Sequence, residues 1–153
     1  MKLGDFMSVY EKAIAFCKKY PCGVYWWRVR KHADIVERHL NPGEFVKYAF
    51  VGQKNNNFFD FFSTSVIALT NKRIIIGRKR VFFGYFLTVI TPDLFNDLSV
   101  YSGIIWGKVE IDTIKEEVFL TNLDKRSLAE IETNVTEFMM EEKKKYKVKD
   151  HEK

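Results

Sequence analysis

The sequence predicts an α+β fold in which about seven antiparallel strands follow N-terminal helices and precede one long helix. Two observations favour this class. Apolar residues recur every three to four positions before residue 41 and again after residue 123, as they do on one face of a helix. Between these segments, short β-branched and aromatic runs are separated by turn residues with no interleaved helical pattern, which favours an antiparallel sheet.

The N-terminal segment is predicted to contain two helices that are separated by Pro21 and Gly23. The second of these helices is expected to stop at Pro42-Gly43, because proline and glycine there end a helical pattern. The apolar positions of the first helix are Phe6, Val9, Tyr10, Ala13, Ile14 and Cys17, and those of the second are His32, Ile35, Val36 and His39 or Leu40.

Six segments between residues 44 and 123 have the composition of strands. They are residues 44–52, 62–69, 72–79, 81–90, 104–111 and 117–123. The C-terminal helix is predicted from the stripe Leu128, Ile131, Val135, Phe138 and Met139, with Asp124 or Ser127 as its N-cap.

Length and composition limit the class of protein. The chain has 153 residues, of which 46% are hydrophobic and 29% charged, which suits one globular domain and excludes a disordered chain. No apolar run reaches the length needed to span a bilayer, and the N-terminus lacks the apolar region of a signal peptide. We therefore expect a cytoplasmic protein, whether free or peripheral to the membrane.

The stretch Val66-Ile67-Ala68-Leu69-Thr70-Asn71-Lys72-Arg73-Ile74-Ile75-Ile76 resembles a signature of bacterial pleckstrin-homology-like (PH-like) domains, in particular the YokE-like group. Residues 40–44, Leu-Asn-Pro-Gly-Glu, are similar to the opening of that family, where a helix leads into the first strand. The resemblance implies a split, strongly bent barrel of about seven antiparallel strands, capped at one end by the C-terminal helix. It divides the chain into an N-terminal helical extension (1–40), a PH-like domain (41–147) and a charged tail (148–153).

The resemblance implies a non-enzymatic binding or scaffolding module. Many eukaryotic members bind phosphoinositides, but residues 62–69 contain no basic side chain, so no inositol phosphate site is carried over. The sequence also lacks a glycine-rich phosphate loop, a Gly-x-Ser-x-Gly motif and a His-Glu-x-x-His motif. We therefore expect no catalytic residues, no cofactor and no small-molecule substrate.

The net charge of +5 is unevenly distributed along the chain. Residues 1–91 carry 15 basic and 6 acidic side chains, whereas residues 92–123 carry 2 basic and 6 acidic ones. A basic half of this kind is typical of proteins that meet an anionic partner, although a solvated lysine-rich surface needs none.

Two segments, residues 18–31 and residues 78–86, combine basic residues with aromatic ones. Such clusters suit an anionic membrane surface, because cations attract headgroups and aromatic rings favour the interface. The alternative is structural: the phenylalanines after residue 80 enter the core, and the tryptophans pack the N-terminal helices onto the sheet. A third aromatic cluster, at residues 55–62, allows the same two interpretations. The candidate binding residues are Lys72, Arg73, Arg78, Lys79 and Arg80, aided by Trp26, Trp27 and Arg28.

Four potential metal ligands, Cys17, Cys22, His32 and His39, occur near the N-terminus. The histidine spacing falls outside the usual separation for zinc, so we favour two buried free thiols and two surface histidines, with no metal. A disulfide is not expected in a cytosolic protein.

Three partners remain open. The first is an anionic membrane surface, bound through the basic N-terminal half. The second is a protein partner or a second copy of the chain, bound through a sheet edge or the N-terminal helix face. Nucleic acid is the least favoured of the three.

Overall fold

The computed structural model describes residues 6–56 and 63–152. Two helices, seven strands and one long helix follow one another along the chain, which confirms the predicted α+β class. The elements are α1 (Val9–Lys19), α2 (Trp26–Arg38), β1 (Val46–Gln53), β2 (Thr64–Thr70), β3 (Ile74–Lys79), β4 (Tyr85–Ile90), β5 (Phe95–Ser102), β6 (Trp106–Thr113), β7 (Glu117–Asp124), the short 3-10 turn η2 (Lys125–Ser127) and α3 (Leu128–His151).

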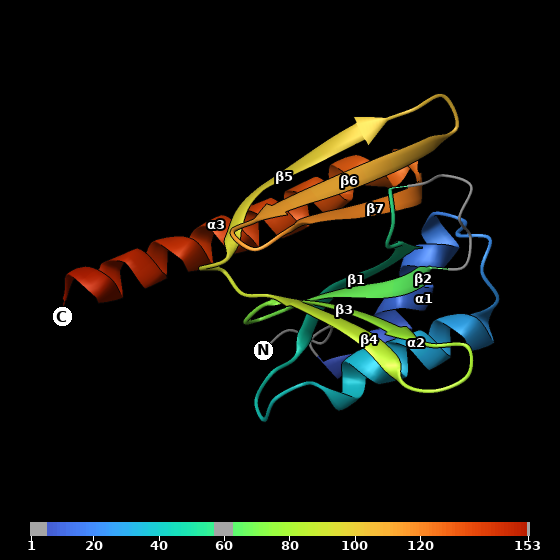
Figure 1. Cartoon of the computed structure of the whole chain (residues 1–153), viewed down its shortest axis with the longest axis horizontal. Coiled ribbons are helices and arrows are strands. Elements are labelled where there is room, and N and C mark those ends of the chain that lie inside the picture. The colour runs from blue at the N-terminus through green and yellow to red at the C-terminus, as the bar shows by residue number, and fades with distance from the viewer. Residues whose placement is uncertain (1–5, 57–62, 153) are drawn as a thin grey trace.

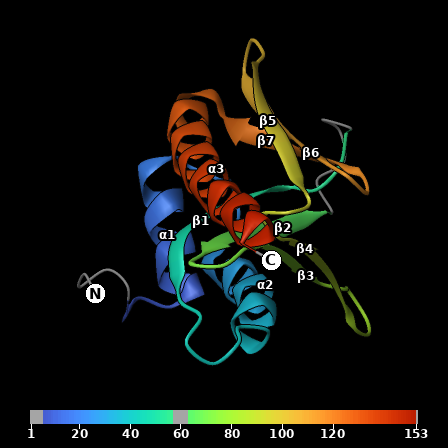
Figure 2. The ribbon, with the colours of Figure 1, turned by 90° about the vertical axis from the view of Figure 1, so that its left-hand side faces the viewer.

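The strands form one antiparallel sheet that is bent into two halves. Their order is β4-β3-β2-β1-β7-β6-β5, and β1 meets β7 only at the pair Gln53 and Thr121 within the described residues. Figures 1 and 2 show the halves β1–β4 and β5–β7 facing each other, with α3 against β5 and with α1 and α2 on the outer side of the first half. This arrangement is the expected split barrel.

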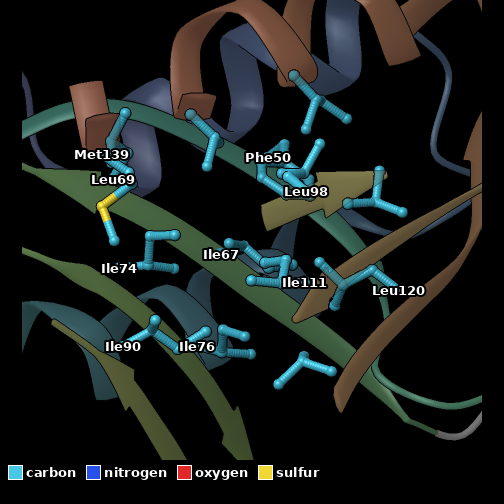
Figure 3. Close-up of a cluster of buried hydrophobic side chains, with 14 of the residues drawn as sticks. Phe50, Ile67, Leu69, Ile74, Ile76, Ile90, Leu98, Ile111, Leu120 and Met139 are labelled. Carbon is cyan, nitrogen blue, oxygen red and sulfur yellow. The ribbon is translucent and has the colours of Figure 1, made fainter. Parts of the chain in front are cut away.

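The main core lies between the two halves of the sheet (Figure 3). Phe50 and Ile67 of the first half meet Ile111 and Leu120 of the second half, and α3 adds Met139. All five side chains are at most 1% exposed. The predicted stripe on the C-terminal helix is therefore the face that closes the barrel.

A second core lies on the outer face of β1–β3. Because side chains alternate along a strand, Ala49 and Val51 point away from Phe50 and the barrel interior. Helices α1 and α2 cover this outer face, so β1–β3 are buried on both sides. The second core contains Val9, Ala13, Val29, Ala33, Val36, Val46, Ala49, Val51, Val66, Ala68 and Ile75.

Gly77 lets α2 lie close to β3. A Cβ atom at this position would lie 2.7 Å from Cγ2 of Val36, which is closer than two carbon atoms approach in proteins. The contact fixes the distance between the helix and the strand.

The Thr70–Arg73 turn of the family-like motif holds a buried ion pair. Arg73 donates to both carboxylate oxygens of Glu44, at 2.9 and 3.0 Å, and to the carbonyl of His39 at 2.8 Å. Thr70 Oγ1 donates to the same carboxylate at 2.7 Å. Burial alone would raise the pKa of the Glu44 carboxyl, but Arg73, the Asn41 N–H and Thr70 together hold it below its usual value. This motif ties the entry of β1 to the β2–β3 turn.

Two strand predictions need correction. Residues 81–84 form the turn between β3 and β4 and do not belong to a strand, and Phe95–Ser102 forms β5, which was not predicted. The first of these segments has strand-like composition, but Gly84 has φ 76°, which turns the chain. The second carries four polar side chains, Asn96, Asp97, Ser99 and Ser102, and a register shift after Phe95, which together obscure its alternation.

Helix α3 continues well past the body of the domain (Figure 1). Its buried residues end at Met139, whereas the helix runs to His151. Ser127 forms no side-chain cap, because its hydroxyl donates to the carbonyl of Asp124; Asp124 instead caps η2 through the N–H of Arg126.

The prediction of free thiols is wrong, because Cys17 and Cys22 form a disulfide that closes the end of α1. The expectation of two surface histidines is wrong for His32, which is only 4% exposed. No three His, Cys, Asp or Glu side chains within residues 6–56 and 63–152 are grouped to hold a metal ion. In the same part of the chain, no helix is long and apolar enough to cross a membrane.

Candidate functional site

The turn between β3 and β4 projects three apolar side chains into solvent. The turn closes with a hydrogen bond of 3.0 Å from the Arg80 N–H to the Gly84 carbonyl. Val81, Phe82 and Phe83 are 78%, 86% and 87% exposed, so these phenylalanines do not enter the core. We call residues 78–86 the basic–aromatic tip.

The cations of this tip lie on two sides of the strand. Arg78 and Arg80 share the barrel-facing side with Phe86, and their guanidinium groups lie 4.5 and 5.2 Å from the centre of its ring. Lys79 alternates to the opposite side, toward α2. The tip therefore presents positive charge around an aromatic ring and beside the exposed phenylalanines.

His32 connects α2 to the base of this tip. Its Nδ1 accepts a hydrogen bond of 2.9 Å from the Lys79 N–H, which requires that this nitrogen be unprotonated. Burial, and to a smaller degree the charges of Lys31, Arg28 and Arg78, together lower the pKa of His32 to about 4. The imidazole is therefore neutral at physiological pH, and cations of α2 and β3 lie near one another around it.

The first turn of α2 adds exposed aromatic residues at the same end of the molecule. Trp26 and Trp27 are 61% and 51% exposed, so they do not pack the helices onto the sheet. The Trp27 ring stacks on Tyr25 with the ring centres 6.2 Å apart. Arg28 reaches the start of β2, where it donates to Thr64 Oγ1 at 3.4 Å.

Lys72 and Arg73 lie at the other end of β3. An extended strand places Lys72 about 20 Å from Arg78, and Arg73 is held by Glu44. The structure thus groups Arg78, Lys79 and Arg80 with the start of α2, and separates these residues from the Lys72–Arg73 pair.

No carboxylate in the described part of the chain forms an ion pair with Arg28 or with the three cations of the tip. The acidic residues of the 92–123 segment gather elsewhere. In the strand register, Asp112 of β6 lies opposite Asp97 of β5 and opposite Glu117 of β7, near the β6–β7 turn. Figure 1 shows this turn at the end of the barrel opposite the β3–β4 turn. The charge asymmetry of the sequence therefore corresponds in part to an asymmetry in space, with cations at one end of the strands and carboxylates at the other.

A second exposed apolar turn was not identified from the sequence. Ile104 and Ile105 in the β5–β6 turn are 93% and 68% exposed, and Trp106, the first residue of β6, is 41% exposed. The sequence does contain an indication of this turn. Two adjacent isoleucines follow Gly103, at positions where turns usually contain Asn, Asp or Gly. The strand predicted at residues 104–111 instead begins at Trp106 and leaves both isoleucines in the turn.

The aromatic cluster at residues 55–62 lies largely outside the described residues, so neither interpretation of it is tested. Lys54, which directly follows β1, is among the described residues. Its ammonium group donates to Thr88 Oγ1 of β4 at 2.9 Å. This contact crosses the inner side of the barrel mouth, close to Arg78 and Phe86.

The sequence is similar to a known family of proteins. A family model described as bacterial PH domain matches residues 40–137, which begin before β1 and end within α3. No curated protein matches the chain.

Proposed function

The chain belongs to the bacterial PH domain family, and on that premise we propose that it is a non-catalytic binding module that associates with anionic membrane surfaces. Its sheet and capping helix form the scaffold of such a module, and the basic–aromatic tip forms the contact. The motif at residues 66–76 further supports placement in the YokE-like group. We propose the cytoplasmic face of the membrane as its location, where reducing conditions would keep Cys17 and Cys22 as two neighbouring thiols in place of the disulfide.

The observation that carries this proposal is the combination of Phe82 and Phe83, each more than 80% exposed, with three cations that have no carboxylate partner among the described residues. Exposing two adjacent phenylalanines to water is unfavourable, and the interfacial region of a bilayer relieves that cost. Each cation near an anionic surface contributes about 1 kcal/mol. The same arrangement would therefore combine insertion with electrostatic attraction.

The first turn of α2 supports the same orientation. Trp26 and Trp27 are amphipathic rings of the kind that favour the membrane interface, and Arg28 lies beside them. They begin the helix whose His32 accepts the Lys79 N–H, so they lie on the side of the tip that faces the helices.

Cosedimentation with vesicles tests the proposal. We expect binding to phosphatidylcholine vesicles that contain phosphatidylglycerol and little binding to phosphatidylcholine alone. Replacing Arg78, Lys79 and Arg80 by glutamine removes about 3 kcal/mol of attraction, which corresponds to a loss of affinity of about 100-fold. Lys115→Gln, in the distant β6–β7 turn, is the matched control. Equal and negligible binding to both vesicles would refute the proposal.

The substitution Lys72→Gln examines the remaining predicted cation separately. Lys72 lies at the opposite end of β3 from the tip, so its loss should change affinity no more than the loss of Lys115 does. A large effect would move the contact surface to the Thr70–Arg73 turn.

Self-association is a second candidate function, which the edge of the sheet favours. Strand β4 ends the strand order, and its six residues, Tyr-Phe-Leu-Thr-Val-Ile, include no charge and no proline. Natural edge strands usually carry a charged residue or a proline that prevents pairing with another strand, and β4 has neither. We propose a second copy of β4 as the partner, because antiparallel pairing would place the two cationic tips at opposite ends of the shared strands. Light scattering tests it: a dimer that Val89→Lys converts to a monomer supports the pairing, and a wild-type monomer at high concentration excludes it.

A further inference from the structure

The β5–β6 turn is built to hold two isoleucines in solvent. The N–H of Gly103 donates to the carbonyl of Trp106 at 2.9 Å, and the two residues between them are Ile104 and Ile105. Lys125 fixes the turn further, because its ammonium group donates to the carbonyl of Ile104 at 3.1 Å. We call residues 103–106 the isoleucine tip.

The local sequence of the isoleucine tip opposes the usual chemistry of turns. Two-residue turns between strands favour Asn, Asp or Gly, which tolerate the required dihedral angles and are well solvated. Ile104 is the most exposed large hydrophobic residue in the described part of the chain, at 93%, and it makes no contribution to either core. A residue that departs from local preference without a packing reason is expected at a functional surface.

The isoleucine tip and the basic–aromatic tip lie at the same end of the molecule. Figure 1 shows the β3–β4 turn and the β5–β6 turn at the right-hand end of the long axis, with the connection between α1 and α2 at that end as well. The C-terminus of α3 lies at the opposite end. A flat surface perpendicular to the long axis would therefore meet all three apolar segments together.

The charges around the isoleucine tip suit the same surface. Lys108 and Lys125 flank the turn, and residues 98–109 contain no acidic side chain. Asp124 lies opposite Trp106 in the strand register, and its carboxylate is paired with Arg126 at 2.6 Å. The acidic residues of β5 and β6 thus lie away from the exposed isoleucines.

We infer that the isoleucine tip is a second membrane-insertion site, and that the domain stands on an anionic bilayer with its long axis upright and α3 pointing away. This inference rests on the proposed function and adds to it a site on the other half of the sheet. Ile104 and Ile105 enter the interfacial region at the same time as Phe82 and Phe83 of the other half of the sheet, and Trp106 lies at headgroup level. The two halves of the split barrel each contribute one insertion site, so the bound domain cannot tilt freely.

The test uses the double substitution Ile104→Ser and Ile105→Ser in the full chain. Its affinity for phosphatidylcholine vesicles containing phosphatidylglycerol should fall about tenfold, because the contact loses two aliphatic side chains that the interfacial region buries only in part. Ile114→Ser is the matched control, since Ile114 is 67% exposed in the β6–β7 turn at the other end. Thermal unfolding of all variants should coincide with that of the wild type.

Trp106 gives a second readout that a mere loss of stability would not produce. In a Trp26→Phe, Trp27→Phe background it is the remaining tryptophan. At saturating vesicle concentration its emission should shift to shorter wavelength and be quenched by brominated lipid. If the wild type binds but the isoleucine variant binds equally well and Trp106 is not quenched, the inference is wrong and the proposed function stands. If the wild type binds neither vesicle, the proposed function fails first. Loss of binding without quenching of Trp106 would also overturn the inference, because the turn would then not enter the bilayer.

Discussion

His32 should make the stability of the domain depend strongly on pH in the acidic range. Its imidazole is buried, accepts a hydrogen bond from the Lys79 N–H, and lies near Arg28, Lys31 and Arg78. Each of these features favours the neutral ring. In the folded state the pKa of His32 is lowered to about 4, from an ordinary value of 6.5.

The sign and size of the effect follow from linkage between proton binding and folding. Below pH 6.5 the unfolded chain binds a proton at His32, whereas the folded chain does so only near pH 4. The stabilisation is therefore complete above pH 6.5 and is lost as the pH falls through the folded pKa. A difference of this size corresponds to about 3 kcal/mol of unfolding free energy.

The substitution His32→Asn isolates this contribution. The Asn side-chain oxygen can accept the Lys79 N–H in place of Nδ1, but it does not titrate. Urea unfolding at pH 7 and at pH 4 should show the wild type losing about 3 kcal/mol more than the variant over this interval. His151→Asn, at the exposed end of α3, is the control and should retain the wild-type slope. Parallel stability curves for the wild type and His32→Asn would refute the reasoning, as would an NMR titration of His32 with an unshifted midpoint.

Three further outcomes are expected. Gly77→Ala should destabilise the domain by about 2 kcal/mol, because the added methyl group forces α2 off β3; a urea midpoint equal to that of the wild type would contradict the contact. Glu44→Gln should cost about 3 kcal/mol in unfolding free energy, because the half-buried Arg73 loses its counter-charge. The matched change Glu142→Gln in a surface ion pair should cost less than about 0.5 kcal/mol in unfolding free energy. Equal losses for the two variants would show that burial does not make the Glu44 pair more important for stability. Hydrogen exchange should be slow in α3 up to Met139 and fast beyond it, because an isolated helical extension is marginally stable; uniform protection would indicate an unseen partner for the extension.

Periodicity predicted most of the fold correctly. The helices at both ends of the chain and most of the strands have clear apolar patterns, and the motif at residues 66–76 pointed to the correct family. Strand β5 was missed because it is an edge strand with polar outward positions and a register shift near its start. A strand with one solvated face and broken alternation has little signal in a single sequence.

Exposure was the property that the sequence predicted least well. Composition cannot distinguish an aromatic residue that fills a core from one that projects from a turn, because both are apolar. Phe82 and Phe83 follow β3 directly and have strand propensity, yet the reversal at Gly84 leaves them outside both cores. Trp26 shares the helical face of Val29, but it begins α2, and the first turn of the helix exposes it.

The disulfide and the buried histidine were missed for a related reason. The cysteines were judged by the expected compartment and not by distance, whereas Cys17 and Cys22 have Cα atoms 5.3 Å apart across the end of α1. His32 was judged as a polar residue that prefers the surface, but a backbone N–H of a neighbouring strand satisfies it.

Because β1–β3 are buried on both faces, the segment that matches the family model is smaller than the segment that must fold together. The family match begins at residue 40, yet the outer face of the sheet is covered by helices that precede it. A chain cut at that boundary would expose Ala49, Val66 and Ile75 to water and should precipitate or bind nonspecifically. Any fragment or fusion of this chain that is meant to fold must therefore carry α1 and α2 together with the sheet.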